Sequence, residues 1–178
     1  IEQNMDVSQP LFAICIKEKL AEPKERVRKH IAIEILLNMI IGKSSKLYKE
    51  LYDEGILFTV PSLDYEFARG YAHILITGQS PEPEKVFQKF KNTVEMMKKT
   101  HINSDEFNRI KKRIYGEYVK EYNDVADIAR MFLADFFKEI NSFDYLEEIS
   151  TVNEEYAEQI LSEIFDDKKM IISVIKKA

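Results

Sequence analysis

The longest amphipathic stretch of the chain covers residues 23–41. Apolar side chains return there at the i, i+3, i+4 spacing of one helical face, as at Ile33, Leu36 and Leu37. A proline opens the stretch and Gly42 follows its last periodic residue, which are the positions that these residue types favour at helix ends. Further apolar positions widen the stripe, so the sequence predicts a helix that is covered on more than one side.

Four shorter apolar runs predict strands. They lie at residues 9–17, 56–61, 71–77 and 170–175. The segment SLDYEFARG between the second and third runs is expected to join or extend them as a hairpin. Within the third run, the alternation of a strand places Ala72, Ile74 and Ile76 on one face and the intervening residues on the other.

Capping residues and prolines mark five more helices. They are expected from Ser44 or Ser45 to residue 53, from the proline-rich segment 80–84 to about residue 100, and over residues 103–122, 124–140 and 153–165. Strands therefore cluster in the first half and at the end of the chain, and helices occupy the middle. This order predicts an α+β fold, a two-layer sandwich of a mostly antiparallel sheet covered by helices, in one domain over residues 1–178.

Composition agrees with one globular unit. The 178 residues are 45% hydrophobic and 32% charged, which matches a folded protein rather than a disordered one. The formal net charge of −5 argues against nucleic acid or an anionic membrane as a partner. The longest apolar run, residues 31–41, contains Glu34 and Asn38 and is too short to span a membrane.

Cys15 is the only cysteine, so neither an intrachain disulfide nor a thiolate zinc cluster can form. Its apolar neighbours predict an inert side chain in the core. A lone cysteine suits the reducing interior of a cell, and we expect a cytoplasmic location. The chain begins at Ile1 without an initiator methionine or a signal segment, which favours a piece of a longer protein or a processed product.

His30 and Glu34 are the first candidates for metal binding, because their i, i+4 spacing places both on one face of the predicted helix. Asn38 continues the same line, but no third ligand is evident. We therefore favour a polar strip on an otherwise apolar helix over a metal site. His73 in a strand and His101 at a helix end are interpreted as hydrogen-bonded or dipole-compensating residues rather than ligands.

Two further motifs have structural explanations. The segment GKSSK, residues 42–46, lacks the glycine spacing and the preceding strand of a phosphate-binding loop, and is interpreted as the end of one helix and the cap of the next. The basic residues 111–113 are followed by Glu117 and Glu121. This pattern is typical of a solvated helix face with i, i+4 ion pairs.

Four phenylalanines fall at or near helical spacing in the last third of the chain. They are Phe132, Phe136, Phe137 and Phe143. Aromatic residues at this spacing favour core packing over a ligand site. Reasoning from the residues alone thus ends at an α+β domain without a self-contained active site.

Three segments occur in an order and spacing that resemble a known family. They are IAIEILLNMIIGKSSKLYKELYDEGILFTV, NSDEFNRIKKRIYGEYVKEYND and STVNEEYAEQILSEIFDDKKMIISVIKK. Together they are similar to the second half of the pitrilysin and insulysin type of zinc metallopeptidase, a family that includes mitochondrial processing peptidase. The resemblance covers nearly the whole chain, from about Met5 to Lys177.

The resemblance implies two similar α+β halves that enclose a substrate chamber. Only the first half usually carries the H-x-x-E-H zinc motif. This chain has no such motif, and His30 and Glu34 do not match its composition or spacing. The resemblance therefore implies a metal-free C-terminal half that holds no cofactor itself, with zinc bound by an N-terminal half outside this sequence or by a paired subunit.

Second halves of this family often supply an arginine and a tyrosine near a glycine turn, which help to hold the substrate. In the segment ELYDEGILF, Tyr52 and Phe58 stand near those two positions, but they lack the guanidinium and the phenolic hydroxyl. No catalytic role is therefore carried over to either residue. Both are candidates for substrate contact, and a partner subunit is an alternative source of the two groups.

The resemblance implies one of two functions. The first is the metal-free half of a zinc metallopeptidase, inactive alone, that walls the chamber and assists the binding of extended peptides, for example by strand addition at an edge formed by residues 56–61 or 71–77. The second is a non-catalytic structural or assembly subunit, or the companion subunit of a peptidase pair. A third interpretation treats His30 and Glu34 as half of an intermolecular metal site.

Overall fold

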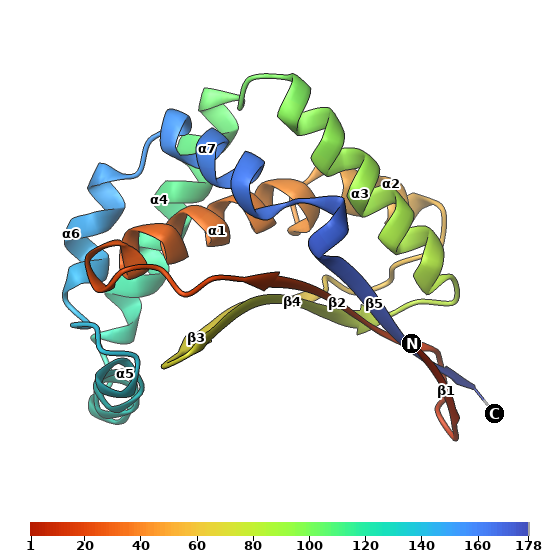
Figure 1. Ribbon diagram of the computed structural model, residues 1–178, viewed down its shortest axis with the longest axis horizontal. Coiled ribbons are helices and arrows are strands. Elements are labelled where there is room, and N and C mark those ends of the chain that lie inside the picture. Colours follow the sequence, from red (N-terminus) through yellow and green to blue (C-terminus); the bar gives the residue numbers. More distant parts are fainter. Residues whose placement is uncertain (178) are drawn as a thin grey trace.

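The computed structural model describes residues 1–177 and contains one curved sheet with helices gathered on one of its faces (Figure 1). The strands are β1 (Glu2–Met5), β2 (Leu11–Glu18), β3 (Ser62–Ala68), β4 (Tyr71–Gln79) and β5 (Met170–Lys177). Their order is β1-β5-β2-β4-β3, and every neighbouring pair is antiparallel except β1 with β5. The helices are α1 (Arg26–Ile41), α2 (Lys46–Asp53), α3 (Pro83–Lys99), α4 (Ser104–Glu121), α5 (Val125–Phe137), α6 (Asp144–Thr151) and α7 (Glu154–Ile164). The predicted α+β fold is confirmed.

Strand alternation produces the two faces of the sheet. In β2, Phe12, Ile14 and Ile16 are buried under the helices, and in β4 the predicted inward set that includes Ile74 and Ile76 is buried as well. The residues between them point to the opposite face. Because side chains alternate along a strand, one layer of helices is enough to bury every second residue.

Helix α1 is the centre of the helical layer. It contacts β3 on the sheet and also packs against α2, α3, α4, α6 and α7. Ile31, Ile35 and Ile40 are completely buried, which confirms the prediction of a helix covered on more than one side. No helix among residues 1–177 combines the length and the apolar character that crossing a bilayer requires.

The predicted strand at residues 56–61 is wrong. The backbone N–H groups of Ile56 and Leu57 both donate to Leu51 O, at 2.8 and 3.1 Å, and Gly55 turns the chain with φ of 71°. This arrangement closes the end of α2, as glycine in the left-handed region commonly does. The two apolar side chains are buried beneath the helices, so the run is apolar because it anchors a helix end and not because it joins the sheet.

The hairpin of the sheet instead consists of β3 and β4. Its first strand falls in the segment SLDYEFA, where Tyr65 and Phe67 are buried while Ser62 and Glu66 are exposed. Gly70, with a positive φ of 94°, forms the turn between the two strands.

The predicted helix cap at Ser45 is confirmed. Ser45 Oγ accepts a hydrogen bond from the Tyr48 N–H at 3.0 Å, so the segment GKSSK ends α1 and caps α2.

Two elements were not expected from the sequence, namely β1 and α6. Strand β1 is short and fully exposed, and it pairs in parallel with β5 at one edge of the sheet. The opposite edge is β3, because β4 lies between β3 and β2. The strand expected at residues 71–77 is present as β4, but it is not available as an edge, since both of its sides are hydrogen-bonded to other strands.

Candidate functional site

The face of the sheet opposite the helical layer is uncovered (Figure 1). Side chains of mixed polarity cross it in register, and one row runs from Asp64 in β3 through Leu75 in β4 and Cys15 in β2 to Ile171 in β5. Ile171 remains 59% exposed. The face thus offers a broad surface of apolar and polar groups that a second protein surface or an extended chain can contact.

Cys15 lies on this open face, and the prediction that it belongs to the core is wrong. The neighbours Ile14 and Ile16 take the two inward positions, so alternation turns Cys15 away from the helices. Partial burial nevertheless raises the pKa of its thiol. A raised thiol pKa keeps the thiolate fraction small, in agreement with the predicted low reactivity.

Tyr52 and Phe58, the predicted substrate-contact residues, flank the turn at the end of α2. Each side chain is 54% exposed, whereas Ile56 and Leu57 between them are fully buried. Tyr52 packs against Tyr48 at a ring distance of 6.2 Å. The anchored turn therefore presents both aromatic side chains to solvent from a fixed backbone.

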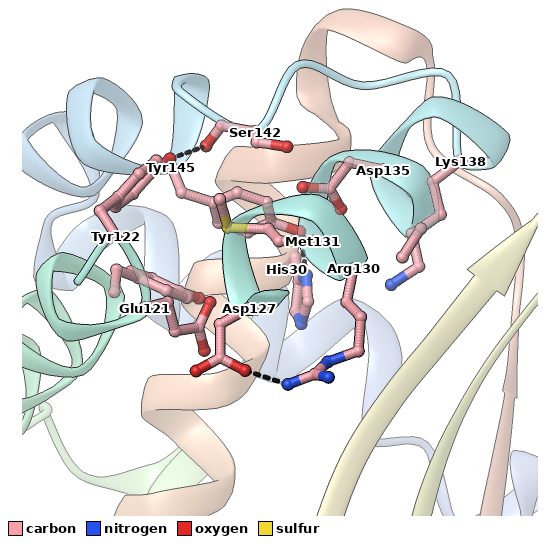
Figure 2. Close-up of a pocket in the computed structure, with 12 residues that line it drawn as sticks. His30, Glu121, Tyr122, Asp127, Arg130, Met131, Asp135, Lys138, Ser142 and Tyr145 are labelled. Atoms are coloured by element: carbon pink, nitrogen blue, oxygen red, sulfur yellow. Dashed lines mark hydrogen bonds and ion pairs between the residues drawn. The ribbon is translucent and has the colours of Figure 1, made fainter. Parts of the chain in front are cut away.

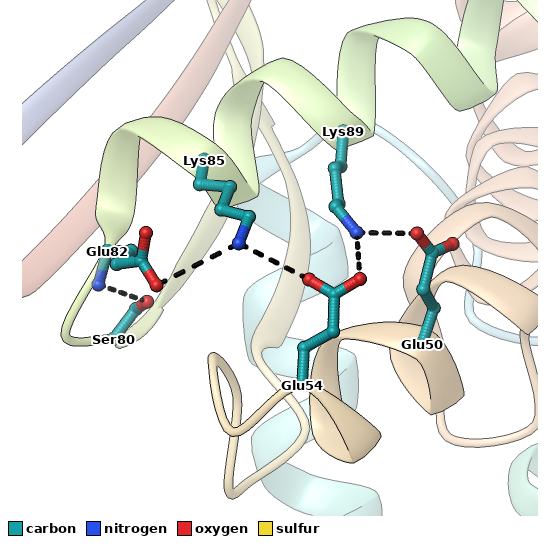
Figure 3. A network of polar contacts seen from close by, with 6 residues as sticks. All are labelled: Glu50, Glu54, Ser80, Glu82, Lys85 and Lys89. Carbon is teal, nitrogen blue, oxygen red and sulfur yellow. Dashed lines mark hydrogen bonds and ion pairs between the residues drawn. The ribbon is translucent and has the colours of Figure 1, made fainter.

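Helix α2 is tied to α3 by a chain of ion pairs (Figure 3). Lys89 Nζ contacts Glu50 Oε1 at 2.5 Å and Glu54 Oε1 at 2.6 Å, and Lys85 Nζ lies 3.4 Å from Glu54 Oε2. Hydrogen bonds to the two glutamates raise the pKa of Lys89, and the bond from Lys89 lowers the pKa of Glu54. The network holds the helix that carries Tyr52 in place at its C-terminal end.

His30 and Glu34 are enclosed by tyrosines rather than exposed as a surface strip. Tyr145 Oη lies 2.7 Å from His30 Nδ1, and Tyr118 Oη donates to Glu34 Oε2 at 2.5 Å. Burial, with the nearby Lys138 ammonium, lowers the pKa of His30 to about 3, so its imidazole is neutral. Burial also raises the pKa of Glu34, and the Tyr118 hydrogen bond opposes that rise.

These side chains do not fit a zinc ion. Both are partly buried and partnered by hydroxyls from α4 and α6, and the metal interpretation of the His30–Glu34 pair is not supported. Over residues 1–177, no group of three or more His, Cys, Asp or Glu side chains lies close enough to hold a metal ion. The line of polar residues on α1 therefore serves packing against α4 and α6, through hydrogen bonds inside the helical layer.

A cavity of about 550 Å³ lies between α1, α4, α5 and α6 (Figure 2). His30, Tyr118 and Tyr145 line it, and so does Asp135 of α5, which is only 5% exposed. A second cavity of about 280 Å³ shares His30, Tyr118 and Lys138 with the first and reaches residues 63–66 of β3. The two cavities therefore adjoin each other between the edge strand of the sheet and the helical layer.

The four phenylalanines expected in the core are exposed instead. Phe136 and Phe137 on α5 are 74% and 68% exposed, and Phe132 and Phe143 are partly exposed as well. The reason is the orientation of α5, whose one fully buried side chain is Asp135. The helix turns an acidic residue inward and its largest apolar residues outward, which is the reverse of an ordinary surface helix.

The basic segment and the two remaining histidines have local partners. Arg113 Nη1 contacts Glu117 Oε1 at 2.6 Å, which confirms the predicted i, i+4 pair, but Lys111 donates to the backbone oxygens of Ser150 and Val152 and so ties α4 to the end of α6. His73 stacks on Tyr71, and His101 Nδ1 lies 3.3 Å from Glu158 Oε1. None of these four basic or imidazole groups therefore needs a ligand to explain its position.

Comparison with known proteins places the fold in a family. The model of the family described as "Peptidase M16 inactive domain" matches residues 1–114. A zinc protease of Bacillus subtilis, uncharacterized zinc protease YmfH, is 24% identical over 99% of this chain and 42% of its own length. Among solved structures, an M16-like peptidase from Alicyclobacillus acidocaldarius has a TM-score of 0.92 at 22% identity, over 99% of this chain and 43% of that one. A protease from Helicobacter pylori has a TM-score of 0.80 at 19% identity, with coverage of 99% and 43%.

The chain belongs to the peptidase M16 inactive domain family, within the zinc protease fold that the sequence resemblance implied. It spans about two fifths of the length of the curated relative that it matches. Its place as an inactive domain agrees with a set of buried polar residues that are engaged with one another and do not fit zinc.

Proposed function

We propose that the chain is the non-catalytic half of a zinc-dependent peptidase, and that it walls a substrate chamber and assists the binding of extended peptides. The observation that carries the proposal is an uncovered, curved sheet face in a member of the M16 inactive domain family. Zinc and the water-activating groups belong, in this proposal, to another half or subunit. The chain by itself then hydrolyses no peptide.

Strand β3 is the proposed docking edge for peptide backbone. It ends the sheet on the side away from β1. It begins at Ser62, ten residues after the exposed Tyr52 and four residues after the exposed Phe58, and the short segment that follows α2 connects them. An unpaired strand edge binds extended chains through main-chain hydrogen bonds that are largely independent of sequence. Tyr52 and Phe58 are proposed to add apolar contacts to such a peptide.

The exposed apolar face of α5 is the proposed contact with the other half or subunit. Val125, Leu133, Phe136 and Phe137 are each at least 60% exposed there. An isolated helix of 13 residues is marginal in water, and a partner that covers this face would supply the missing packing. The chain spans 42% and 43% of the length of two of its relatives, and in this proposal the partner corresponds to the remaining part of such a protein.

Reconstitution tests the proposal. The zinc-loaded other half of the parent protein is mixed with this chain, and cleavage of an unstructured peptide is measured. We expect kcat/KM to rise by about tenfold or more over the other half alone, which corresponds to about 1.4 kcal/mol of transition-state stabilisation. We expect Phe136→Ser to weaken the pairing, so that a higher concentration of this chain is needed to reach half of the maximal increase in kcat/KM.

Unchanged cleavage after complex formation would contradict the proposal. It would favour the assembly subunit, which predicts a stable complex without any effect on hydrolysis. Absence of a complex at high concentration would contradict the proposed pairing surface as well.

The predicted substrate contacts are tested in the same reconstituted protein. We expect Tyr52→Ala with Phe58→Ala to raise KM for the peptide by about threefold to tenfold while kcat changes little, because the lost contacts are equal in the ground and transition states. Tyr115→Ala is the matched control, since Tyr115 is an exposed tyrosine on α4. An equal KM in the double variant and the control would rule out the two residues as contacts.

A further inference from the structure

Two buried polar groups in the larger cavity have no hydrogen-bond partner among the described residues. They are Asp135 Oδ2 on α5 and Ser142 Oγ in the loop before α6. Asp135 is 5% exposed and Ser142 is 1% exposed, and both line the cavity. Ser142 opposes the rise in the pKa of Asp135 that burial causes, but no hydrogen bond of normal geometry joins the two side chains. Buried polar groups are normally satisfied, so this pair indicates a missing partner.

The cations that line this cavity are engaged elsewhere. Figure 2 shows the Arg130 guanidinium directed at Asp127, with which it forms an ion pair. Lys138 Nζ lies over the Phe67 ring, 5.2 Å from its centroid. Among the described residues neither cation forms an ion pair with the Asp135 carboxylate, although the Lys138 ammonium is near enough to oppose the rise in its pKa that burial causes.

The other groups around Asp135 do not supply a positive charge. His30 is neutral, because burial holds its pKa at about 3. Glu121 adds a further carboxylate to the lining, and burial and the neighbouring acids, Asp135 first among them, raise its pKa. The remaining walls are hydroxyl groups and aromatic rings, including Tyr122, whose hydroxyl donates to Ser142 O at 2.9 Å.

We propose that this cavity binds an organic cation, an alkylammonium or guanidinium group, with the Asp135 carboxylate as its counter-charge and Ser142 Oγ as a second acceptor. Hydrogen bonds between such a cation and a buried carboxylate are short and strong. The tyrosine rings of the walls favour a cation in addition, because the face of an aromatic ring attracts positive charge.

The source of the cation is a lysine or arginine side chain of a peptide that lies along β3, and this part rests on the proposed function. The smaller cavity joins the edge strand at residues 63–66 to His30, Tyr118 and Lys138, which also line the larger one. Because the two cavities adjoin at these shared residues, we assign this region to a long basic side chain that extends from a peptide on β3 toward Asp135. The chain would then prefer a basic residue at one position of its peptide substrates.

Small probes test the cation site in the unaltered chain. Kd is measured by NMR titration for acetyl-arginine amide, acetyl-lysine amide and acetyl-citrulline amide, the last being an uncharged analogue of arginine. We expect the arginine and lysine probes to bind about tenfold or more tightly than citrulline, since a hydrogen bond to a charged group is the stronger kind. Equal binding of arginine and citrulline overturns the proposal, and this comparison needs no variant to fold.

Variants then locate the site. We expect Asp135→Asn to abolish the difference between arginine and citrulline, and Ser142→Ala to reduce it. Asp53→Asn is the matched control, because Asp53 is an exposed acid at the end of α2 that does not line the cavity. A preference for arginine that survives in Asp135→Asn overturns the assignment of the counter-charge.

Peptides separate this inference from the proposed function. The binding of two extended peptides is compared, which are identical except that one has arginine and the other citrulline at a single position. We expect the arginine peptide to bind more tightly than the citrulline peptide and more tightly than acetyl-arginine amide. Equal binding of the two peptides overturns the cation site and leaves the peptide-binding function standing. Binding of the free arginine amide without binding of either peptide supports the cation site and contradicts the peptide as its source.

Discussion

Replacing Phe90 by alanine is expected to lower the free energy of unfolding of the chain by about 3–5 kcal/mol. Phe90 of α3 is completely buried and packs against Phe165, with ring centroids 6.5 Å apart. Removing the ring loses its transfer free energy and leaves a cavity that a close-packed interior closes only in part. A loss of this size is a large fraction of the stability of a typical domain, and urea unfolding at neutral pH measures it.

Phe136→Ala is the matched comparison for that experiment. The side chain is 74% exposed, so we expect its removal to change the free energy of unfolding by less than about 0.5 kcal/mol. The sequence pattern alone predicts that Phe136 is a core aromatic residue as well. A loss of several kcal/mol at Phe136 would show that α5 packs with its aromatic face inward.

Acid conditions are expected to destabilise the chain through His30. Its pKa is about 3 in the folded protein, because burial and Lys138 oppose protonation, and 6.5 is the ordinary value. Between these two values the unfolded chain binds the proton more readily, so stability falls as pH falls below about 6.5. At pH 4.5 the histidine accounts for about 2–3 kcal/mol of lost stability, at 1.36 kcal/mol for each pH unit.

The variant His30→Asn isolates this effect, since asparagine can replace the contact to Tyr145 but does not titrate. We expect the difference in free energy of unfolding between pH 7 and pH 4.5 to be smaller in the variant than in the original chain by that same amount. The carboxyl groups around the histidine, including Glu34 and Asp135 with their raised pKa values, are present in both proteins and cancel in the comparison. An identical pH dependence of the two proteins would show that His30 is accessible to solvent and protonates normally.

The buried polar residues of α1, α4 and α6 illustrate how an inactive domain keeps a polar interior. Tyr118 and Tyr145 satisfy Glu34 and His30, and each pair joins two helices. Asp135 lacks such a partner, although a nonpolar residue at that place would avoid the cost of burying a charge. We therefore assign His30 and Glu34 to the packing of the helices and Asp135 to ligand binding.

Much of the fold followed from local patterns in the sequence. The alternation in β4, the wide apolar stripe of α1 and the caps at Ser45 and Asn103 each depend on residues that are close along the chain, and each was confirmed. The strand β2 was confirmed as well, but its alternation was not predicted, and Cys15 was therefore placed in the core. The strand predicted at residues 56–61 was wrong. An apolar run this short shows no clear periodicity, so its pattern cannot distinguish a strand from a segment that anchors the end of a helix.

The sequence by itself determined the class of this protein. The order of strands and helices predicted the α+β sandwich, and the order of three weak motifs predicted the inactive half of a zinc protease. Both predictions were possible because these orders are properties of the linear sequence. Only the tertiary structure decided which residues meet. It turned Asp135 of α5 inward and the phenylalanines outward, paired His30 and Glu34 with tyrosines about 80 to 115 residues away, and made β3 rather than β4 the edge of the sheet. Helix orientation and sheet order depend on contacts between segments that are distant in sequence, and no local period records them.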